Sequence, residues 1–402
     1  MRCCSVRVDG PAQADGGRGL FLDCASSAVV VGGEKVLVER PLHVFHANKH
    51  ETLACGRCLK HLTPPGIREG SDECIDFLTQ IACMALGARS RSSICASGIV
   101  EYVDCKNRCG EVYCSVACMR LAFEEDGHDF LCTGNCVSEQ DSLFRFKVHA
   151  MQCDDSFLLA AKVIASILEK AICASTSADD VSATCMRMWS LRYGALVPKE
   201  TRDAGDELKD DDEDEKSNIA HRLLMEALSS HPKVRNANVD VFALFPLNAF
   251  LSLLKKFVCN NVGVRVRHPA CSALLSCDLR FAEHLAASLG KLLNDEEEEP
   301  LCADDLLESP DWYFPPVDGE GLYPVLAAAN HACDDPNIVL SFEADATLIV
   351  TASKDMKANE ELSHDYARHA RVPEERRAAL AQYGIACECA KCISPPAVCA
   401  TK

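Results

Sequence analysis

The residues best able to do chemistry are grouped toward the C-terminal end of the sequence. Asn330 and His331 stand just before Cys333, Tyr366 follows an acidic run, and the clip Cys387-x-Cys389-x-x-Cys392 comes next. An asparagine amide can bind a polar ligand edge, and a tyrosine hydroxyl can orient a reacting amine. A closed structural zinc takes four ligands, so the clip needs a fourth, and Cys333 is the natural candidate. Such a cross-link, with an apparent binding free energy of roughly 10 to 16 kcal/mol, would hold two walls of a pocket together.

Earlier in the sequence, candidate metal ligands form four close pairs. They are Cys55 and Cys58, Cys105 and Cys109, Cys114 and Cys118, and His128 and Cys132. Two tetrahedral zinc ions need this number of ligands, so three zinc ions are predicted in all. The alternative is a set of unrelated buried cysteines, which would have to give four ordered pairs by chance. The long insertion after Cys58 also holds single cysteines that could replace a ligand, although none belongs to a close pair: Cys74, Cys83 and Cys95.

Composition limits the class of protein. The 402 residues are 48% apolar, which predicts a globular protein of two or three domains. No signal-peptide or membrane-span pattern is seen, so we expect a protein of the cytoplasm, the nucleus or both, without membrane contact. Dense cysteine there favours metal over disulfides. Cys3 and Cys4 could be palmitoylated, but a pair entering an apolar strand favours buried cysteine.

Charge narrows the choice of partner. The net charge of -19 argues against direct binding to nucleic acid and favours a basic protein or peptide. Much of the charge lies in the runs 206–216 and 295–299, which predict solvated loops more than binding surfaces. We expect the first run to be part of a disordered loop at about 203–217 that contributes nothing to the fold.

Hydrophobic patterning predicts a mixture of strands and helices, the α+β class. Short strands broken by glycine are expected at 6–8, 16–22, 28–31 and 34–39, and again at 337–342 and 347–351. Helical spacing of apolar residues is found at 157–171 and 222–228, and after Pro246 at 247–254. Pro373 opens and Gly384 closes a further short helix.

Several motifs resemble, in order, those of the SET and MYND domain-containing (SMYD) lysine methyltransferases. They are Gly17-Arg18-Gly19, Val38-Glu39-Arg40-Pro41-Leu42, the four ligand pairs with Tyr113 before Cys114, Gly319-Glu320-Gly321-Leu322-Tyr323, Asn330-His331-Ala332-Cys333, Glu361-Leu362-x-x-x-Tyr366, and Tyr383-x-Ile385-x-Cys387. Only ten residues follow Cys392, which resembles the branch of the family without a long C-terminal helical domain.

The resemblance implies a β-rich, knotted SET core with insertions. The expected domains are 1–50 for the N-terminal part of the SET domain, 51–135 for a MYND-type zinc finger with a long internal insertion, 136–260 for a helical insertion, 261–370 for the catalytic SET core, and 371–402 for a zinc-binding post-SET segment. In a MYND finger the first and third pairs share one metal and the second and fourth the other. This implies one site of Cys55, Cys58, Cys114 and Cys118, and another of Cys105, Cys109, His128 and Cys132.

The resemblance also assigns roles at the site. Tyr366 and Tyr383 are expected to be catalytic. Contacts to S-adenosylmethionine are expected from Gly17, Arg18, Gly19, Asn260, Asn330, His331, Tyr366 and Ile385. This chain departs from the family pattern at Ala332, where relatives have serine, in one extra residue before Pro336, and at Ile385, where relatives have a phenylalanine that covers the adenine.

The implied activity is transfer of a methyl group from S-adenosylmethionine to a lysine of a basic protein, such as a histone tail or a ribosomal protein. The competing hypothesis is a zinc-dependent adaptor whose MYND finger binds a proline-containing peptide while the altered SET core does not turn over. Cofactor binding would discriminate the two. We expect a monomer; the substrate lysine and the degree of methylation are left open.

Overall fold

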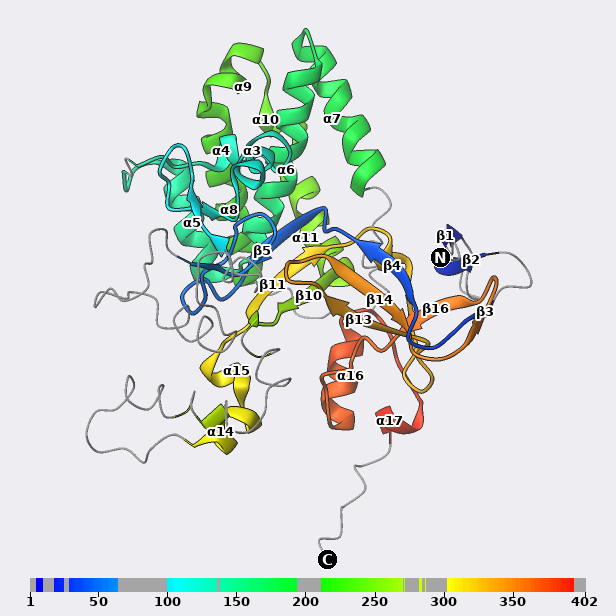
Figure 1. The fold of residues 1–402 in the computed structure, drawn as a ribbon. Helices are drawn as coiled ribbons and strands as arrows, with labels where there is room; N and C mark the ends of the chain where they lie inside the picture. Colours follow the sequence, from blue (N-terminus) through cyan, green and yellow to red (C-terminus); the bar gives the residue numbers. More distant parts are fainter. Residues whose placement is uncertain are drawn as a thin grey trace, which may run out of the picture.

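The structure is a computed structural model that describes residues 5–9, 18–24, 29–63, 100–135, 138–193, 211–269, 271, 282–283, 286 and 302–393. Helices gather in one block above a group of small β-sheets, and the C-terminal helices lie below the sheets (Figure 1). The predicted α+β class is confirmed. Several predicted features lie outside the described residues: Cys3, Cys4, Gly17, Cys74, Cys83, Cys95 and the acidic residues 206–210 and 295–299.

One sheet joins the two ends of the sequence. Its strand order is β1 (Ser5–Asp9), β2 (Gly19–Asp23), β16 (Glu361–His364) and β12 (Asn330–His331). Strand β2 pairs antiparallel with β16, with Leu20 opposite Leu362, and β12 runs parallel to β16. Leu20 and Leu22 are fully buried on one face of β2, as a strand packed on a core requires. This sheet places the Asn330–His331 pair beside the strand that leads to Tyr366.

Three other sheets build the rest of the core around it. Their orders are β10 (Asn261–Val266), β11 (Val317–Leu322) and β5 (His43–His46); β13 (Ile338–Phe342), β14 (Leu348–Ala352) and β4 (Lys35–Glu39); and β15 (Met356–Lys357) with β3 (Val29–Val30). They share a cluster of buried apolar side chains that includes Val264, Tyr323 and Leu348. Burial alternates along β13, with Ile338 and Leu340 inside and Val339 exposed.

The helical block packs around a single central helix. It consists of α5 (Ser142–Cys153), α6 (Ser156–Ala174), α7 (Ala178–Tyr193), α8 (Asp211–Ser230), α9 (Pro232–Ala237), α10 (Val241–Leu244) and α11 (Leu247–Asn260). Helix α6 is buried on most sides and carries the predicted apolar residues from Phe157 to Ala171. Helix α11 packs through Phe250, Leu253 and Phe257 and runs directly into β10. Asn260 therefore lies at the junction of helical block and sheets.

The cysteine-rich segment is small and lies against α6. It holds the short pairs β6 (Leu62–Thr63) with β7 (Val100–Glu101) and β8 (Val103–Asp104) with β9 (Val112–Tyr113), then α3 (Val116–Glu124) and α4 (His128–Leu131). Lys162 of α6 donates to the carbonyls of Val44 in β5 and Gly56 in this segment, at 2.7 and 3.2 Å. One ammonium thus joins helical block, sheet and cysteine-rich segment.

The remaining elements include one predicted helix, and α8 corrects one expectation. Helices α14 (Ala303–Glu308) and α15 (Pro310–Tyr313) precede β11, the 3-10 helix η1 (Leu326–Ala328) precedes β12, and α16 (Pro373–Ala381) and α17 (Ala390–Ile393) come last. Of these, the helix predicted between Pro373 and Gly384 is confirmed as α16; the others were not predicted. The expectation of a disordered loop to residue 217 is wrong for its second half, because α8 begins at Asp211. Carboxylates in a first helical turn interact favourably with the free N–H groups and the helix dipole, which outweighs their mutual repulsion.

Among the described residues, no helix combines the length and the apolar character needed to cross a bilayer.

Candidate active site and metal centres

A cavity of about 130 Å³ opens where the helical block meets the sheets. Its walls come from the end of α11 and start of β10, from η1 and Ala329, from the segment after β16, and from the loop after α16; the residues used below are Asn260, Ala329, His364, Tyr366, Arg368 and Tyr383. Pockets for drug-sized ligands measure roughly 300–1,000 Å³. The cavity is therefore sized for one side chain more than for a whole nucleotide.

Tyr366 is held firmly at this cavity. Its hydroxyl donates to the main-chain carbonyl of Ala329 at 2.6 Å, and its ring packs against Tyr383 with 4.7 Å between ring centroids. Burial raises the pKa of Tyr366 well above its usual value, and burial also raises that of Tyr383. Both phenols stay protonated at neutral pH, so they can orient a reacting group but cannot act as bases.

Asn330 links three segments at the start of the site. Its amide nitrogen donates to the carbonyl of Arg18 at 3.0 Å and to the Glu361 carboxylate at 2.6 Å. The structure thereby brings the predicted residues Arg18 and Gly19 of the first loop to the Asn-His pair. An asparagine amide also has a carbonyl oxygen, which can accept a hydrogen bond from a polar ligand. An apolar side chain at this position could make neither contact.

His331 connects Tyr366 to a metal ligand. Its Nδ1 accepts from the backbone N–H of Tyr366 at 3.1 Å, so Nδ1 carries no proton. The proton must then be on Nε2, which lies 2.9 Å from the sulfur of Cys333 and donates to it. Burial lowers the pKa of His331, so the ring is neutral at pH 7.

The structure treats the other predicted cofactor residues differently. Asn260 is buried and lines the cavity. Ile385 instead packs beside Tyr366 in a small cluster with Ala379 and Leu380 and is not among the residues lining the cavity. The role of each residue toward the cofactor stays a prediction.

Three positioning groups were not found from sequence. Glu39 accepts from the backbone N–H groups of Val325 and Leu326 at 2.8 and 2.9 Å and so fixes η1 on the cavity wall. Asn337, buried, exchanges hydrogen bonds with β16 by donating to the Glu361 carbonyl and accepting from the Ser363 N–H. The third, Arg376, is buried beside Cys333. A buried polar group needs hydrogen-bond partners, so it often has a structural role. Local spacing does not show that these three positions are buried, so the sequence offers no signal for them.

The three predicted sets of metal ligands are each brought together. Each set has its ligand atoms within 4.8 Å of one another: Cys55, Cys58, Cys114 and Cys118; Cys105, Cys109, His128 and Cys132; and Cys333, Cys387, Cys389 and Cys392. Sulfur atoms on a tetrahedral zinc lie about 3.8 Å apart, given a Zn–S length of about 2.3 Å. The structure has Cys58 and Cys114 at 3.7 Å, Cys105 and Cys132 at 3.8 Å, and Cys333 at 3.5 Å from Cys387 and from Cys392. The residues fit zinc.

Thiol chemistry supports a cation at these positions. In the first set the pKa values of Cys55 and Cys58 are raised, chiefly by the hydrogen bond each shares with Cys114. Four thiolates at such separations repel one another unless a divalent cation neutralises them. The chain therefore has Cys/His clusters suited to zinc, while a count of three ions stays a prediction.

Gly127 explains how His128 reaches its set. It has φ of +71°, and a Cβ there would come within 2.4 Å of the Ala165 backbone in α6. Only glycine allows the turn and this close approach. Helix α4 therefore starts against α6, and the His128 ring packs on Tyr113 and Phe123, with centroid distances of 5.9 and 4.7 Å.

Comparison with known proteins finds one matching domain model and several similar methyltransferases. A SET domain model matches residues 209–367. Histone-lysine N-methyltransferase ATXR2 of Arabidopsis thaliana is 28% identical over 72% of this chain and 62% of its own length. Human protein-lysine N-trimethyltransferase SMYD5 is 26% identical over 94% of this chain and 84% of its own. Mouse histone-lysine N-methyltransferase SMYD3 is 39% identical over a shorter stretch, 18% of this chain and 17% of its own.

These matches confirm the resemblance to SMYD methyltransferases stated from the motifs, and the match to SMYD5 extends over nearly the whole chain. Together they show that residues 209–367 resemble a SET domain and that the chain is similar in sequence to the SMYD and ATXR2 lysine methyltransferases.

Proposed function

We propose that this chain is an S-adenosylmethionine-dependent protein-lysine N-methyltransferase acting on a basic protein, with histone tails and ribosomal proteins as the substrate classes. The observation that carries the proposal is the tyrosine pair at the cavity, where Tyr366 is fixed by its hydrogen bond to the Ala329 carbonyl and packs against the tilted ring of Tyr383. The names of the relatives support lysine as the acceptor.

The cavity provides what an incoming lysine needs. At pH 7 a free lysine must lose its proton before it can attack, which costs about 4.6 kcal/mol for roughly 3.4 pK units. A narrow, partly apolar wall formed by Leu326, Ala327 and Leu340 disfavours the charged ammonium and lowers this cost. Phenol oxygens and main-chain carbonyls then orient the neutral amine through its N–H groups.

Among the described residues lining the cavity, the cationic side chain is Arg368, which is exposed. Burial lowers the pKa of His364 to about 4, so the ring is neutral during turnover. Arg368 and His369 also line the cavity, and the guanidinium donates to the Leu340 carbonyl and to His369. The surrounding negative charge of the chain, -19 in all, attracts a basic substrate to the surface.

S-adenosylmethionine would supply the methyl group as an activated sulfonium. The residues that would hold it are Arg18 and Gly19 of the first loop, Asn260, and the Asn330–His331 pair. Asn330 keeps the first loop against β12 through the Arg18 carbonyl. This bond keeps the first loop beside the Asn330–His331 pair, where both could contact one ligand.

The test is methyl transfer from tritiated S-adenosylmethionine to fractionated cell extract, with the wild type compared to Tyr366→Phe. Labelled protein bands that depend on the wild-type chain and lose most of their label with the variant support the proposal. Hydrolysis and amino-acid analysis of a labelled band must return methyllysine. Label in another amino acid would contradict the lysine assignment.

The adaptor hypothesis is separated by calorimetric titration of the zinc-loaded chain with S-adenosylmethionine. An adaptor has no need of the cofactor. Absence of binding at millimolar cofactor, with the zinc complement measured in the same sample, would reject the enzyme and favour peptide binding at the cysteine-rich segment.

A further inference from the structure

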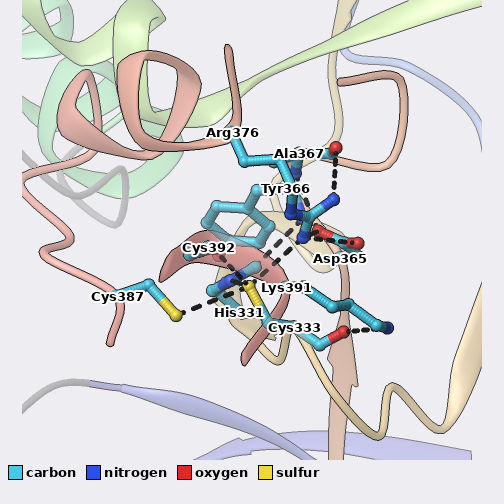
Figure 2. Close-up of polar contacts among 9 residues, drawn as sticks. All are labelled: His331, Cys333, Asp365, Tyr366, Ala367, Arg376, Cys387, Lys391 and Cys392. Atoms are coloured by element: carbon cyan, nitrogen blue, oxygen red, sulfur yellow. Dashed lines mark hydrogen bonds and ion pairs between the residues drawn. The ribbon is translucent and has the colours of Figure 1, made fainter. Parts of the chain in front are cut away.

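Arg376 occupies an unusual position for an arginine. It lies on α16 with only 6% of its surface exposed, and its side chain points from the helix into the segment around Tyr366 (Figure 2). Within the described residues its Nε has no hydrogen-bond partner. Burying a guanidinium is costly unless its contacts compensate, so packing alone does not explain an arginine here.

The guanidinium forms hydrogen bonds to the residues on both sides of Tyr366. One Nη atom reaches both carboxylate oxygens of Asp365 at 2.9 Å, and the other donates to the Ala367 carbonyl at 2.8 Å. Asp365 in turn accepts from the Ala367 N–H at 2.9 Å. Tyr366 is therefore the central residue of a turn whose two flanks are tied to one side chain. A planar fork can do this and a single ammonium cannot.

The same guanidinium also contacts the metal set. The Nη that binds Asp365 lies 3.2 Å from the sulfur of Cys333, which already accepts from His331 Nε2 at 2.9 Å. Cys333 is 3.5 Å from Cys387 and from Cys392 (Figure 2). Two donors thus stabilise one thiolate from outside the set. Such outer contacts orient a ligand and tune its hold on the metal.

We propose that Arg376 is a positioning residue that couples the Cys333–Cys392 metal set to Tyr366. Metal bound to the set fixes the position of the Cys333 sulfur, which accepts from His331 and Arg376. His331 in turn accepts from the Tyr366 N–H, and Arg376 binds the neighbouring residues Asp365 and Ala367. The catalytic consequence rests on the proposed function, whereas the coupling itself is a property of the fold. Tyr366 is aimed at the cavity only while the set holds its metal.

The experiment uses the full chain as Arg376→Met and Arg376→Lys, with Arg371→Met as a matched control, because Arg371 is an exposed arginine just before the same helix. Zinc affinity is measured by chelator competition with a zinc count on each sample. Peptide-level hydrogen exchange reports the protection of residues 361–368 with and without chelator. Turnover and cofactor affinity are measured in parallel.

Loss of the guanidinium should lower the zinc affinity of the Cys333–Cys392 set by roughly 10- to 100-fold, while the other two zinc ions are retained. Exchange in 361–368 should rise in both Arg376 variants, and chelation should add little more to it. In the wild type and in Arg371→Met, chelation alone should cause that rise. The two perturbations are then non-additive, which a merely structural role of Arg376 would not produce. Turnover should fall with cofactor affinity unchanged.

Unchanged zinc affinity in Arg376→Met, or additive effects of variant and chelator on 361–368, would overturn the coupling. Should Arg376→Met lose all its zinc and fail to fold, Arg376→Lys is judged by the same two readouts. If the wild type transfers no methyl group at all, the proposed function fails, but the zinc and exchange measurements still decide the coupling.

Discussion

Tyr366 donates its hydroxyl proton to the carbonyl oxygen of Ala329 at 2.6 Å across the end of the cavity. This hydrogen bond uses the single hydroxyl proton of Tyr366. What this oxygen can still offer a ligand is its lone pairs, which can accept from an amine N–H. The site therefore favours a ligand that donates hydrogen bonds, and the N–H groups of a neutral lysine amine can do so.

Removing that hydroxyl in Tyr366→Phe should lower kcat by roughly 10² to 10³, about 2.7 to 4 kcal/mol of transition-state stabilisation, with little change in cofactor affinity. Tyr323→Phe is the matched control, because the buried Tyr323 donates an equally short bond, 2.6 Å, to the Ala346 carbonyl away from the cavity. It should cost stability and leave kcat near the wild-type value. Equal loss of turnover in both variants would mean that Tyr366 acts through the fold.

Asn330→Ala should weaken S-adenosylmethionine binding directly. The change removes the donor to the Arg18 carbonyl and leaves a polar ligand edge unpaired, a loss of about 1 to 3 kcal/mol. Calorimetric titration measures this as roughly a 5- to 150-fold rise in Kd. Asn218→Ala, on an exposed position of α8, is the control. A wild-type Kd for the Asn330 variant would remove this residue from the cofactor site.

Purified chain should contain three zinc ions by mass spectrometry. Cys387→Ser should leave two, because it breaks only the set of Cys333, Cys387, Cys389 and Cys392. Cys58→Ser should likewise remove one ion from the first set. Two or fewer ions in fully loaded wild-type protein would show that one cluster is a thiol cluster alone.

Glu39→Gln should loosen the cavity wall. The carboxylate accepts two backbone N–H bonds at the start of η1, and an amide can replace only one of the two acceptor oxygens. We expect a loss of about 1.5 to 3 kcal/mol in the free energy of unfolding, measured by denaturant titration. Glu343→Gln, whose side chain is 51% exposed, should change little. Similar stability of the two variants would contradict the anchoring role.

Mild acid should destabilise the fold through buried histidines. Burial lowers the pKa of His61 to about 4 and that of His268 to about 3, from 6.5. Below pH 6.5 these histidines bind protons in the unfolded chain but not in the folded chain. The free energy of unfolding is therefore highest above pH 6.5 and falls as the pH drops toward 4, by up to about 3 kcal/mol per histidine.

Thermal midpoints between pH 7 and about 5.5, above the range where thiolate ligands are lost to protonation, test this slope. His268→Phe should flatten it, since Phe314 stacks on that ring at 5.4 Å and accepts an aromatic replacement. His50→Gln, with 78% of the side chain exposed, should not. A slope that is the same in all three proteins would assign the acid sensitivity to other groups.

Sequence spacing was sufficient for features that repeat locally. Spacing identified close ligand pairs such as Cys55 and Cys58, and helical periodicity predicted α6 and α11; the grouping of the pairs into sets came from the MYND resemblance. Strand alternation failed at Glu39. The register of β4 shifts between Val350 and Thr351 of its partner, so Glu39 turns inward where simple alternation does not place it.

Other features depend on contacts that no local pattern encodes. Arg376 looks like part of an exposed, charged helix segment, yet it is buried because Cys333 and Asp365 reach it from elsewhere in the chain. The start of α8 at Asp211 was missed because like-charged runs predict solvated chain, whereas a helix N-terminus stabilises them. Tertiary context outweighed local propensity in both cases.

The pairing of β2 with β16 has a consequence for biosynthesis. Arg7 of β1 bonds to Asn359, 352 residues later, and β2, already paired with β1, meets its second partner strand only at Glu361 and Leu362. At about 5–20 residues per second, the ribosome needs on the order of half a minute between the two strands. During that time Leu20 and Leu22 have no sheet to bury them, and the growing chain presents an unpaired apolar edge of the kind that chaperones cover. A nascent chain stalled before residue 361 should therefore be cut by protease within 19–23, whereas the released protein should be protected there.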